Sequence, residues 1–218
     1  ERKAKSGDKE LNAQFEFMTK IKTALDNGDP ARTVPVPDSH KVFFKTLNLL
    51  TAKPILYVCN VGENEASTGN EQSQKVEKMA KNNGALAVVI CASIESEIAQ
   101  LEDAEEKEAF LDDLGLEEPG LDKIIRAGYN LLNLQTFFTA GPKETRAWTV
   151  RQGAMAPEAA GRIHTDFERG FIKAEVISFQ DYVDLGGEQK AKEAGKLRLE
   201  GKDYTVKDGD IILFRFNV

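Results

Sequence analysis

Two short stretches carry polar side chains that could hold a ligand, and each follows a run of apolar residues. The first run, 55–60, ends at Asn60, and Glu63 follows three positions later. The second run, 85–90, leads into the tripeptide Cys91-Ala92-Ser93. An asparagine amide donates and accepts hydrogen bonds, and a carboxylate accepts them. The pair can therefore recognise a ligand that offers both donors and acceptors.

The predicted elements place both stretches at one edge of a sheet. Each apolar run is typical of a buried strand, and helices are predicted over 71–84, 94–115 and 120–132. Continuously apolar strands separated by helices indicate a parallel sheet that is covered on both faces. Ligands of such sheets bind beyond the carboxyl ends of the strands. We therefore expect an α/β fold in which the two stretches form half of a pocket.

The order Asn60-Val61-Gly62-Glu63 resembles the NKxD motif with which enzymes of the GTPase superfamily read a purine base. In that motif the asparagine binds the purine, the lysine stem covers its face, and the aspartate accepts two hydrogen bonds from guanine. Val61 keeps the apolar cover, whereas Glu63 carries its carboxylate one methylene further out. That displacement should relax or reverse the preference for guanine, by on the order of 1 to 3 kcal/mol.

The tripeptide Cys91-Ala92-Ser93 stands about thirty residues after Asn60. This is the offset of the SAK-like loop whose backbone N–H meets the purine in GTPases. Taken alone, Asn-x-x-Glu after a strand also arises by chance in α/β proteins. The second loop favours the base-reading interpretation over that alternative.

A helix is predicted at the start of the chain, ending at the sequence DNGDP with Gly28 as its C-cap. Its apolar stripe consists of Leu11, Phe15, Met18, Ile21 and Leu25. A stripe of this width needs a packing partner. We expect that partner on another chain or upstream of Glu1; the alternative is that the helix covers its own globular body.

The character of the sequence changes near Leu134, where short strands and turns replace long helices. Two strands are predicted within 135–153, a helix over 156–170 and a strand over 171–177. A closing hairpin is predicted over 204–218, with its turn at the Asp-Gly pair 208–209. The result is a small α+β domain over residues 134–218.

Longer phrases are similar to the YchF subfamily of Obg-like ATPases, within the Obg-type GTPases. They are AKSGDKE, LLTAKPILYVCNVGE, FFTAGPKETRAWTVRQGAMAPEAAGRIHTDFERGFIKAEVIS and AGKLRLEGKDYTVKDGDIILFRFNV. The resemblance implies a split P-loop NTPase domain with a coiled-coil insertion, followed by a ubiquitin-like TGS domain. It assigns residues 1–49 to the helical coiled-coil arm and connector, 50–133 to the second half of the nucleotide-binding domain, and 134–218 to the TGS domain.

The resemblance also implies a cytoplasmic, ribosome-associated regulatory ATPase or GTPase that accepts or prefers ATP over GTP and uses Mg²⁺. Its base-binding residues would be Asn60, Val61, Glu63, Cys91, Ala92 and Ser93. Cys91 departs from the subfamily, which usually has serine there.

The 218 residues contain no GxxxxGK[ST] loop, which in such enzymes cradles the phosphates and supplies a ligand to Mg²⁺. The nearest string, 195–203, has one residue too many between its glycines and ends in aspartate. We therefore expect no catalytic residue, no Mg²⁺ ligand and no hydrolysis from this chain alone, with the intact parent protein an ATP or GTP hydrolase. His164, Thr165 and Asp166 could be drawn as a catalytic set, but no oxyanion loop accompanies them, and a structural or binding role is favoured.

The net charge of −7 lies in the first part of the chain: residues 1–133 hold 16 basic and 23 acidic residues, and residues 134–218 hold 13 of each. An acidic chain binds nucleic acid poorly without a local basic face, and no DNA contact is expected. Candidates for contacts to structured RNA, the ribosome or another partner are Arg146, Arg151, Arg169 and Lys173. An ordinary neutral surface is the alternative interpretation of these residues. The alternative function is a nucleotide-independent RNA- or protein-binding module.

Two further classes are disfavoured by the sequence. The two cysteines lie in apolar runs without a CxxC spacing, so no metal site is expected. No apolar run approaches the roughly 18 to 20 residues of a membrane span, and the first ten residues have no signal-peptide core. We expect a cytoplasmic protein with no membrane contact.

Overall fold

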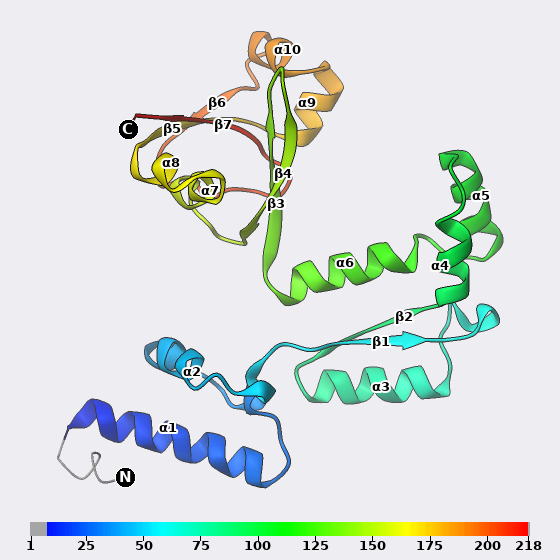
Figure 1. The fold of residues 1–218 in the computed structure, drawn as a ribbon, viewed down its shortest axis with the longest axis vertical. Coiled ribbons are helices and arrows are strands. Elements are labelled where there is room, and N and C mark those ends of the chain that lie inside the picture. The colour runs from blue at the N-terminus through cyan, green and yellow to red at the C-terminus, as the bar shows by residue number, and fades with distance from the viewer. Residues whose placement is uncertain (1–7, 218) are drawn as a thin grey trace. The chain divides into compact units, whose positions relative to one another are not determined.

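The structure is a computed structural model that describes residues 8–217. The chain divides into two compact units, Glu1–Leu131 and Leu132–Val218, called below the N-terminal and the C-terminal unit. Figure 1 shows the helices and strands of both units. Residues 4–7 of the phrase AKSGDKE lie outside the described residues.

The N-terminal unit begins with helix α1 (Lys9–Asp26). Asp8 caps it, because its Oδ1 accepts the N–H of Glu10 at 2.8 Å. The predicted stop is confirmed, since α1 ends just before Gly28, which has a φ of 83°. A connector of 3₁₀ turns and one short helix follows: Ala31–Thr33, Asp38–His40, α2 (Lys41–Thr46) and Leu50–Ala52.

The connector covers one face of α1, which the sequence stripe did not identify. Phe17 and Ile21 are buried against Ala31, and the Phe17 ring packs edge-on to Phe44, with 5.8 Å between ring centroids. Of the predicted stripe only Ile21 is buried; Phe15, Met18 and Leu25 remain 40%, 45% and 39% exposed. The helix therefore has two apolar faces, and within residues 8–217 the face with Phe17 and Ile21 is the one that is covered.

Arg32 fastens this helical part to the α/β part of the unit. Its Nε donates to the carbonyl of Asn83 at 3.0 Å, and its Nη1 donates to the carbonyl of Thr51 at 3.2 Å. These are charge-assisted hydrogen bonds to backbone acceptors in a partly buried position.

The α/β part contains the two predicted parallel strands, β1 (Leu56–Asn60) and β2 (Leu86–Ile90), in register from Leu56↔Leu86 to Asn60↔Ile90. Helix α3 (Glu71–Asn82) connects them, and α6 (Gly120–Leu131) packs on the other side of the strands (Figure 1). The predicted helix over 94–115 is two helices, α4 (Ala92–Ile98) and α5 (Ala104–Asp113). Among the described residues β1 has β2 as its only neighbour, and Val58 is 46% exposed.

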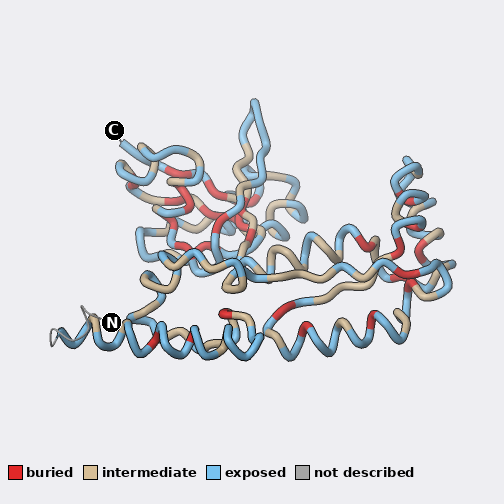
Figure 2. The backbone as a smooth tube through the Cα atoms, turned by 60° about the horizontal axis from the view of Figure 1, so that its bottom comes forward, coloured by how far each residue is buried: buried red, intermediate tan, exposed pale blue. Residues whose placement is uncertain are grey.

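The C-terminal unit is a five-stranded mixed sheet with strand order β4-β3-β7-β5-β6. Its elements are β3 (Leu134–Ala140), β4 (Thr145–Arg151), α7 (Ala156–Ile163), α8 (Thr165–Arg169), β5 (Phe171–Ile177), α9 (Phe179–Leu185), α10 (Glu188–Glu193), β6 (Arg198–Glu200) and β7 (Ile211–Phe216). Figure 2 shows many of the buried residues of this unit close together. Its core includes Phe137, Val150, Val176 and Ile212, each less than 2% exposed.

Two predictions for this unit are wrong. The closing hairpin does not form, because β7 pairs in parallel with β3 and antiparallel with β5, while 204–209 are turns and irregular backbone apart from a bridge between Thr205 and Met155. Asp208 and Gly209 do form a turn, but it is tied to Thr136, whose N–H donates to Asp208 Oδ1 at 2.8 Å. The helix predicted over 156–170 breaks at His164, which has extended backbone angles between α7 and α8.

No helix among residues 8–217 combines the length and the apolar character needed to cross a bilayer.

A polar network around the buried Asp210 joins β6 to the segment that precedes β7. Asp210 is 2% exposed and accepts the Tyr204 hydroxyl at 2.7 Å and the Lys207 N–H at 2.8 Å. Arg198 donates to the Tyr204 hydroxyl at 3.0 Å. Burial, and next the Asp210 carboxylate, raise the pKa of Tyr204 to about 12. Because this value lies above the ordinary pKa of about 10, the stability it contributes is present below pH 10 and is lost as the pH rises through about 12.

Replacing Tyr204 by phenylalanine should lower the free energy of unfolding of the C-terminal unit by about 1 to 2 kcal/mol, because the buried Asp210 carboxylate loses a donor. Denaturant unfolding followed by the fluorescence of Trp148, the chain's one tryptophan, measures this. Tyr182→Phe is the control, since its hydroxyl has no hydrogen bond to another described residue. Equal unfolding midpoints for the two variants would contradict the prediction.

Candidate functional site

The carboxyl ends of β1 and β2 are tied together by two hydrogen bonds. The Val61 N–H donates to the Ile90 carbonyl at 2.9 Å, which extends the ladder one residue beyond Asn60. Asn60 Oδ1 accepts the Ala92 N–H, also at 2.9 Å. Because the oxygen faces this N–H, the Asn60 amide group is oriented with its Nδ2 free to donate elsewhere. The structure thus brings the first predicted loop against the second.

A second link joins Glu63 to the same loop. The Ser93 hydroxyl donates to Glu63 Oε1 at 3.0 Å, and Cys91 Sγ lies 3.1 Å from Ser93 Oγ. Since a hydroxyl has one hydrogen and Ser93 gives it to the carboxylate, the Cys91 thiol is the donor to Ser93. The three side chains form a chain of hydrogen bonds that ends on the carboxylate, so Cys91 braces the loop through Ser93.

The predicted base-binding residues differ in exposure. Asn60, Glu63, Ala92 and Ser93 are exposed, whereas Val61 and Cys91 are buried, at 9% and 4%. The Ala92 N–H is already donated to Asn60, so a ligand would have to compete for it. Three of the six predicted residues, Asn60, Glu63 and Ser93, therefore present polar side chains at the surface, and the two buried ones support them.

Glu65 and Asn70 hold the rest of the first loop. Asn70 Nδ2 donates to Glu65 Oε2 at 2.8 Å, and Asn70 Oδ1 accepts the N–H of Gln72 at 3.0 Å at the start of α3. The loop after β1 is thereby anchored at both of its ends.

No sequence pattern pointed to Glu95, which lies on α4 two residues after Ser93. Its Oε1 accepts the Gly120 N–H at 2.6 Å and its Oε2 accepts the Leu121 N–H at 3.0 Å. These amides begin α6, and 25 residues separate the acid from them. No local pattern connects residues at that distance.

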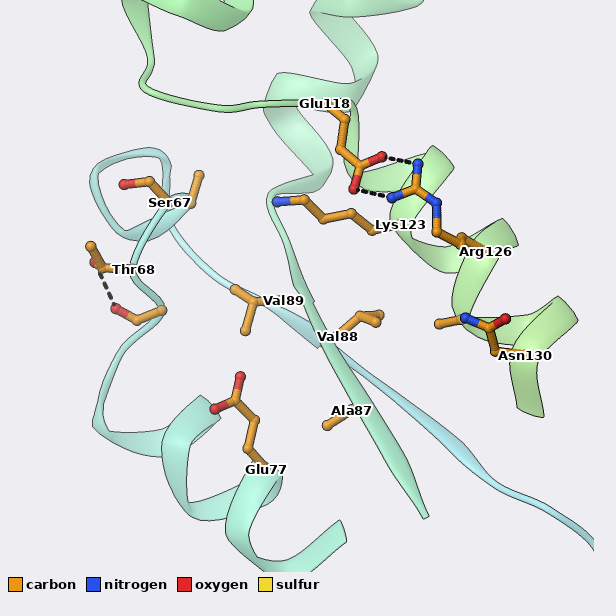
Figure 3. Close-up of a pocket in the computed structure, with 13 residues that line it drawn as sticks. Ser67, Thr68, Glu77, Ala87, Val88, Val89, Glu118, Lys123, Arg126 and Asn130 are labelled. Atoms are coloured by element: carbon orange, nitrogen blue, oxygen red, sulfur yellow. Dashed lines mark hydrogen bonds and ion pairs between the residues drawn. The ribbon is translucent and has the colours of Figure 1, made fainter. Parts of the chain in front are cut away.

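A hollow of about 370 Å³ lies along β2, between α3 and α6 (Figure 3). Its polar lining includes Ser67, Thr68, Glu77, Lys123 and Asn130. Arg126 also borders it and pairs with both oxygens of Glu118, at 2.8 and 2.5 Å. None of the predicted base-binding residues lines this hollow.

The four predicted RNA or partner residues do not form one cluster. Arg146 and Arg151 lie on the edge strand β4, whereas Lys173 lies on β5, three strands further in, which is roughly 14 Å at the usual strand spacing. Arg169 ends α8. Arg146 stacks over the Trp148 ring, with 4.3 Å from Cζ to the centroid.

Lys173 lies in a mixed-charge neighbourhood. Its partner across the ladder, Arg215, donates to both oxygens of Glu175, at 3.0 and 3.1 Å. The hydrogen bond from Arg215 lowers the pKa of Glu175, and the charge of Lys173 adds to the effect. Lys173 therefore lies beside an ion pair and not within a cluster of free basic side chains.

His164 has a structural role. Its Nδ1 accepts the Asp166 N–H at 3.2 Å, so it caps α8. The ring nitrogen that a catalytic set would need is used in this cap. Among the described residues no group of three or more histidine, cysteine, aspartate or glutamate side chains is placed to hold a metal ion.

Comparisons with known proteins now give this geometry a context. A family model described as YchF-GTPase_C, protein of unknown function, matches residues 134–217. The "Ribosome-binding ATPase YchF" of Haemophilus influenzae is 54% identical over 218 residues, which is 100% of this chain and 60% of that protein. The chain belongs to the YchF family. It spans about 60% of the length of the curated relatives it matches.

Other members of the family extend the comparison. The Bacillus subtilis "Ribosome-binding ATPase YchF" is 52% identical over 99% of the chain and 59% of that protein. "Obg-like ATPase 1" of Rattus norvegicus is 41% identical over 98% of the chain and 54% of that protein. The solved structure of the Schizosaccharomyces pombe YchF GTPase matches with a TM-score of 0.80 and 33% identity, over 96% of the chain and 57% of that structure.

Replacing Asn60 by alanine should loosen the second loop, because the Ala92 N–H loses its acceptor. We expect amide hydrogen exchange of residues 91–94 to become about tenfold faster, corresponding to the loss of one hydrogen bond worth about 1.4 kcal/mol. Asn82→Ala at the exposed end of α3 is the control and should leave this segment unchanged. Unchanged exchange in the Asn60 variant would show that the loop is held by other contacts.

Proposed function

We propose that residues 50–133 are the base-reading second half of a nucleotide-binding domain in a ribosome-associated regulatory NTPase. The observation that supports it is the double link between the strand ends, Asn60 to Ala92 and Glu63 to Ser93. It places an amide and a carboxylate over one loop in the order that a base-reading site requires. The names of the YchF relatives, a ribosome-binding ATPase and a GTPase, agree with this proposal.

The proposal includes the rest of the chain. Residues 1–49 are the coiled-coil arm and connector, and the exposed Phe15, Met18 and Leu25 of α1 are suited to a second helix. Residues 134–218 are the TGS domain. The protein that carries the whole domain hydrolyses ATP or GTP with Mg²⁺ in the cytoplasm, and the phosphate and Mg²⁺ ligands lie outside these 218 residues.

ATP is accepted at least as well as GTP because Glu63 is already engaged. Guanine recognition needs a carboxylate that accepts two donors of the ring edge, and the Ser93 hydroxyl holds Glu63 Oε1 instead. Adenine presents an acceptor at that edge and gains nothing from the carboxylate. The Asn60 Nδ2 donor is available to either purine.

Removing the Ser93 hydroxyl should raise the affinity for GTP relative to ATP about 5- to 10-fold, since a released Glu63 carboxylate can accept from guanine. The test is competition of ATP and GTP for a fluorescent nucleotide on the protein with its whole domain, comparing Ser93→Ala with Ser96→Ala on the same helix. Ser96 is exposed, and its hydroxyl has no partner among the described residues. A wild-type protein that strongly prefers GTP, or a ratio unchanged by Ser93→Ala, would refute this account of selectivity.

A second candidate is a nucleotide-independent RNA-binding module, which one observation favours. The β3–β4 ribbon continues to Ala140↔Thr145, beyond the single pairing of β3 with β7 at Phe138↔Ile211. It carries Arg146 stacked on Trp148, and residues 141–147 are all exposed. An exposed guanidinium that is stacked on an aromatic ring can contact an RNA phosphate or base.

Arg146→Ala should weaken binding to ribosomes or structured RNA. It should also reduce, by about one, the slope of the logarithm of the association constant against the logarithm of the salt concentration. Arg162→Ala, an exposed arginine on α7, is the control. The measurement is made with and without ATP: a loss that is the same in both states favours the module, and a loss only in the ATP state favours the regulatory NTPase.

A further inference from the structure

The side chain of Glu95, on α4 just after the Cys91–Ser93 loop, is hydrogen-bonded to the start of helix α6. The carboxylate accepts two N–H groups of the first turn of α6, those of Gly120 and Leu121, one with each oxygen. The first N–H groups of a helix have no acceptor within the helix, and they attract negative charge. Glu95 therefore makes two charge-assisted hydrogen bonds in a partly buried position.

The packing around Gly120 shows how closely this contact is fitted. A Cβ added to Gly120 would lie 2.8 Å from Glu95 Oε1 and 2.8 Å from Ile90 Cγ2. Ile90 is the last residue of β2, its carbonyl accepts the Val61 N–H, and it pairs with Asn60. The end of β2, the first turn of α6 and the start of α4 consequently meet at one glycine.

The Glu95 end of this contact is close in the chain to the second loop of the site, Cys91–Ser93. Glu95 follows Ser93, the partner of Glu63, by two residues on α4. The Cys91–Ser93 loop cannot shift without moving the Glu95 carboxylate relative to Gly120, because α4 is hydrogen-bonded from its start: the Glu95 N–H donates to the Cys91 carbonyl at 3.0 Å.

We propose that Glu95 is a positioning residue for base recognition. Through its contact with Gly120 and Leu121, it couples nucleotide binding at the Cys91–Ser93 loop to the stability of the first turn of α6. This inference rests on the proposed function, because it needs a nucleotide at that loop. A coupling of this kind is reciprocal: whatever factor the contact adds to nucleotide affinity, the nucleotide adds to the stability of the contact.

The first test is amide hydrogen exchange of the protein that carries the whole nucleotide-binding domain. Saturating ATP should slow exchange of the Gly120 and Leu121 amides about tenfold, since couplings between sites are commonly 5- to 150-fold. Exchange within residues 123–130 of α6 should change much less. Equal exchange at Gly120 and Leu121 with and without ATP would overturn the coupling.

The second test is the reciprocal one. Glu95→Gln should weaken ATP binding about tenfold and abolish the ATP-dependent protection, because a neutral amide can accept only one of the two N–H groups. Glu95→Asp keeps the charge and should therefore retain part of the ATP affinity and part of the ATP-dependent protection. Glu97→Gln on the exposed side of the same helix is the control and should bind ATP like the wild type.

A glycine pair tests the contact without altering its charge. Gly120→Ala pushes the Glu95 carboxylate away and should reproduce the effect of Glu95→Gln, whereas Gly128→Ala, with no atom within 4 Å of its added Cβ, should not. If Gly120→Ala fails to fold, the Glu95 and Glu97 variants decide alone.

The outcomes distinguish a failure of the proposed function from a failure of the role of Glu95. Wild-type protein that binds neither ATP nor GTP would refute the proposed function and, with it, this inference. Wild-type protein that binds ATP, together with a Glu95→Gln variant of equal affinity and equal amide protection, would refute only the role of Glu95.

Discussion

The hydrogen bond from the Ala92 N–H to Asn60 Oδ1 fixes the geometry on which the candidate site depends. It can form only because β1 and β2 are in the register Asn60↔Ile90, with the Val61 N–H on the Ile90 carbonyl. A slip of one residue would turn Asn60 to the opposite face of the sheet. The parallel ladder, and so the apolar runs that bury it, set the position of every polar group at this edge.

Most polar groups of the site are hydrogen-bonded to one another, and the Nδ2 of Asn60 is left to donate to a ligand. Cys91 donates to Ser93, Ser93 donates to Glu63, and Asn60 accepts from Ala92. A ligand that enters must exchange these bonds for its own, so each of its bonds contributes only the difference between the new partner and the old one. Selectivity between ligands of similar size is then decided by which internal bond they replace.

Sequence reasoning could identify what depends on local pattern. Apolar runs followed by Asn60 and by Cys91-Ala92-Ser93 predicted two parallel strands whose ends lie side by side, and the strands are there. It missed what depends on distant parts of the chain. Phe17, on a second face of α1, is buried by a connector whose path no periodicity reveals, and Glu95 meets α6 across 25 residues. The last strand was misassigned because the Asp-Gly turn indicates a hairpin locally, whereas β7 pairs along both of its edges with strands distant in the sequence, β3 and β5.

The free edge of β1 affects how these residues behave when they are handled in isolation. In the part of the chain that the structure describes, β1 has one neighbour, and Val58 on it is nearly half exposed. An unpaired edge with an apolar side chain is a template for any other strand, including the same strand of a second molecule. A second molecule can add a strand at this edge, so we expect the association state of this unit to depend on its concentration.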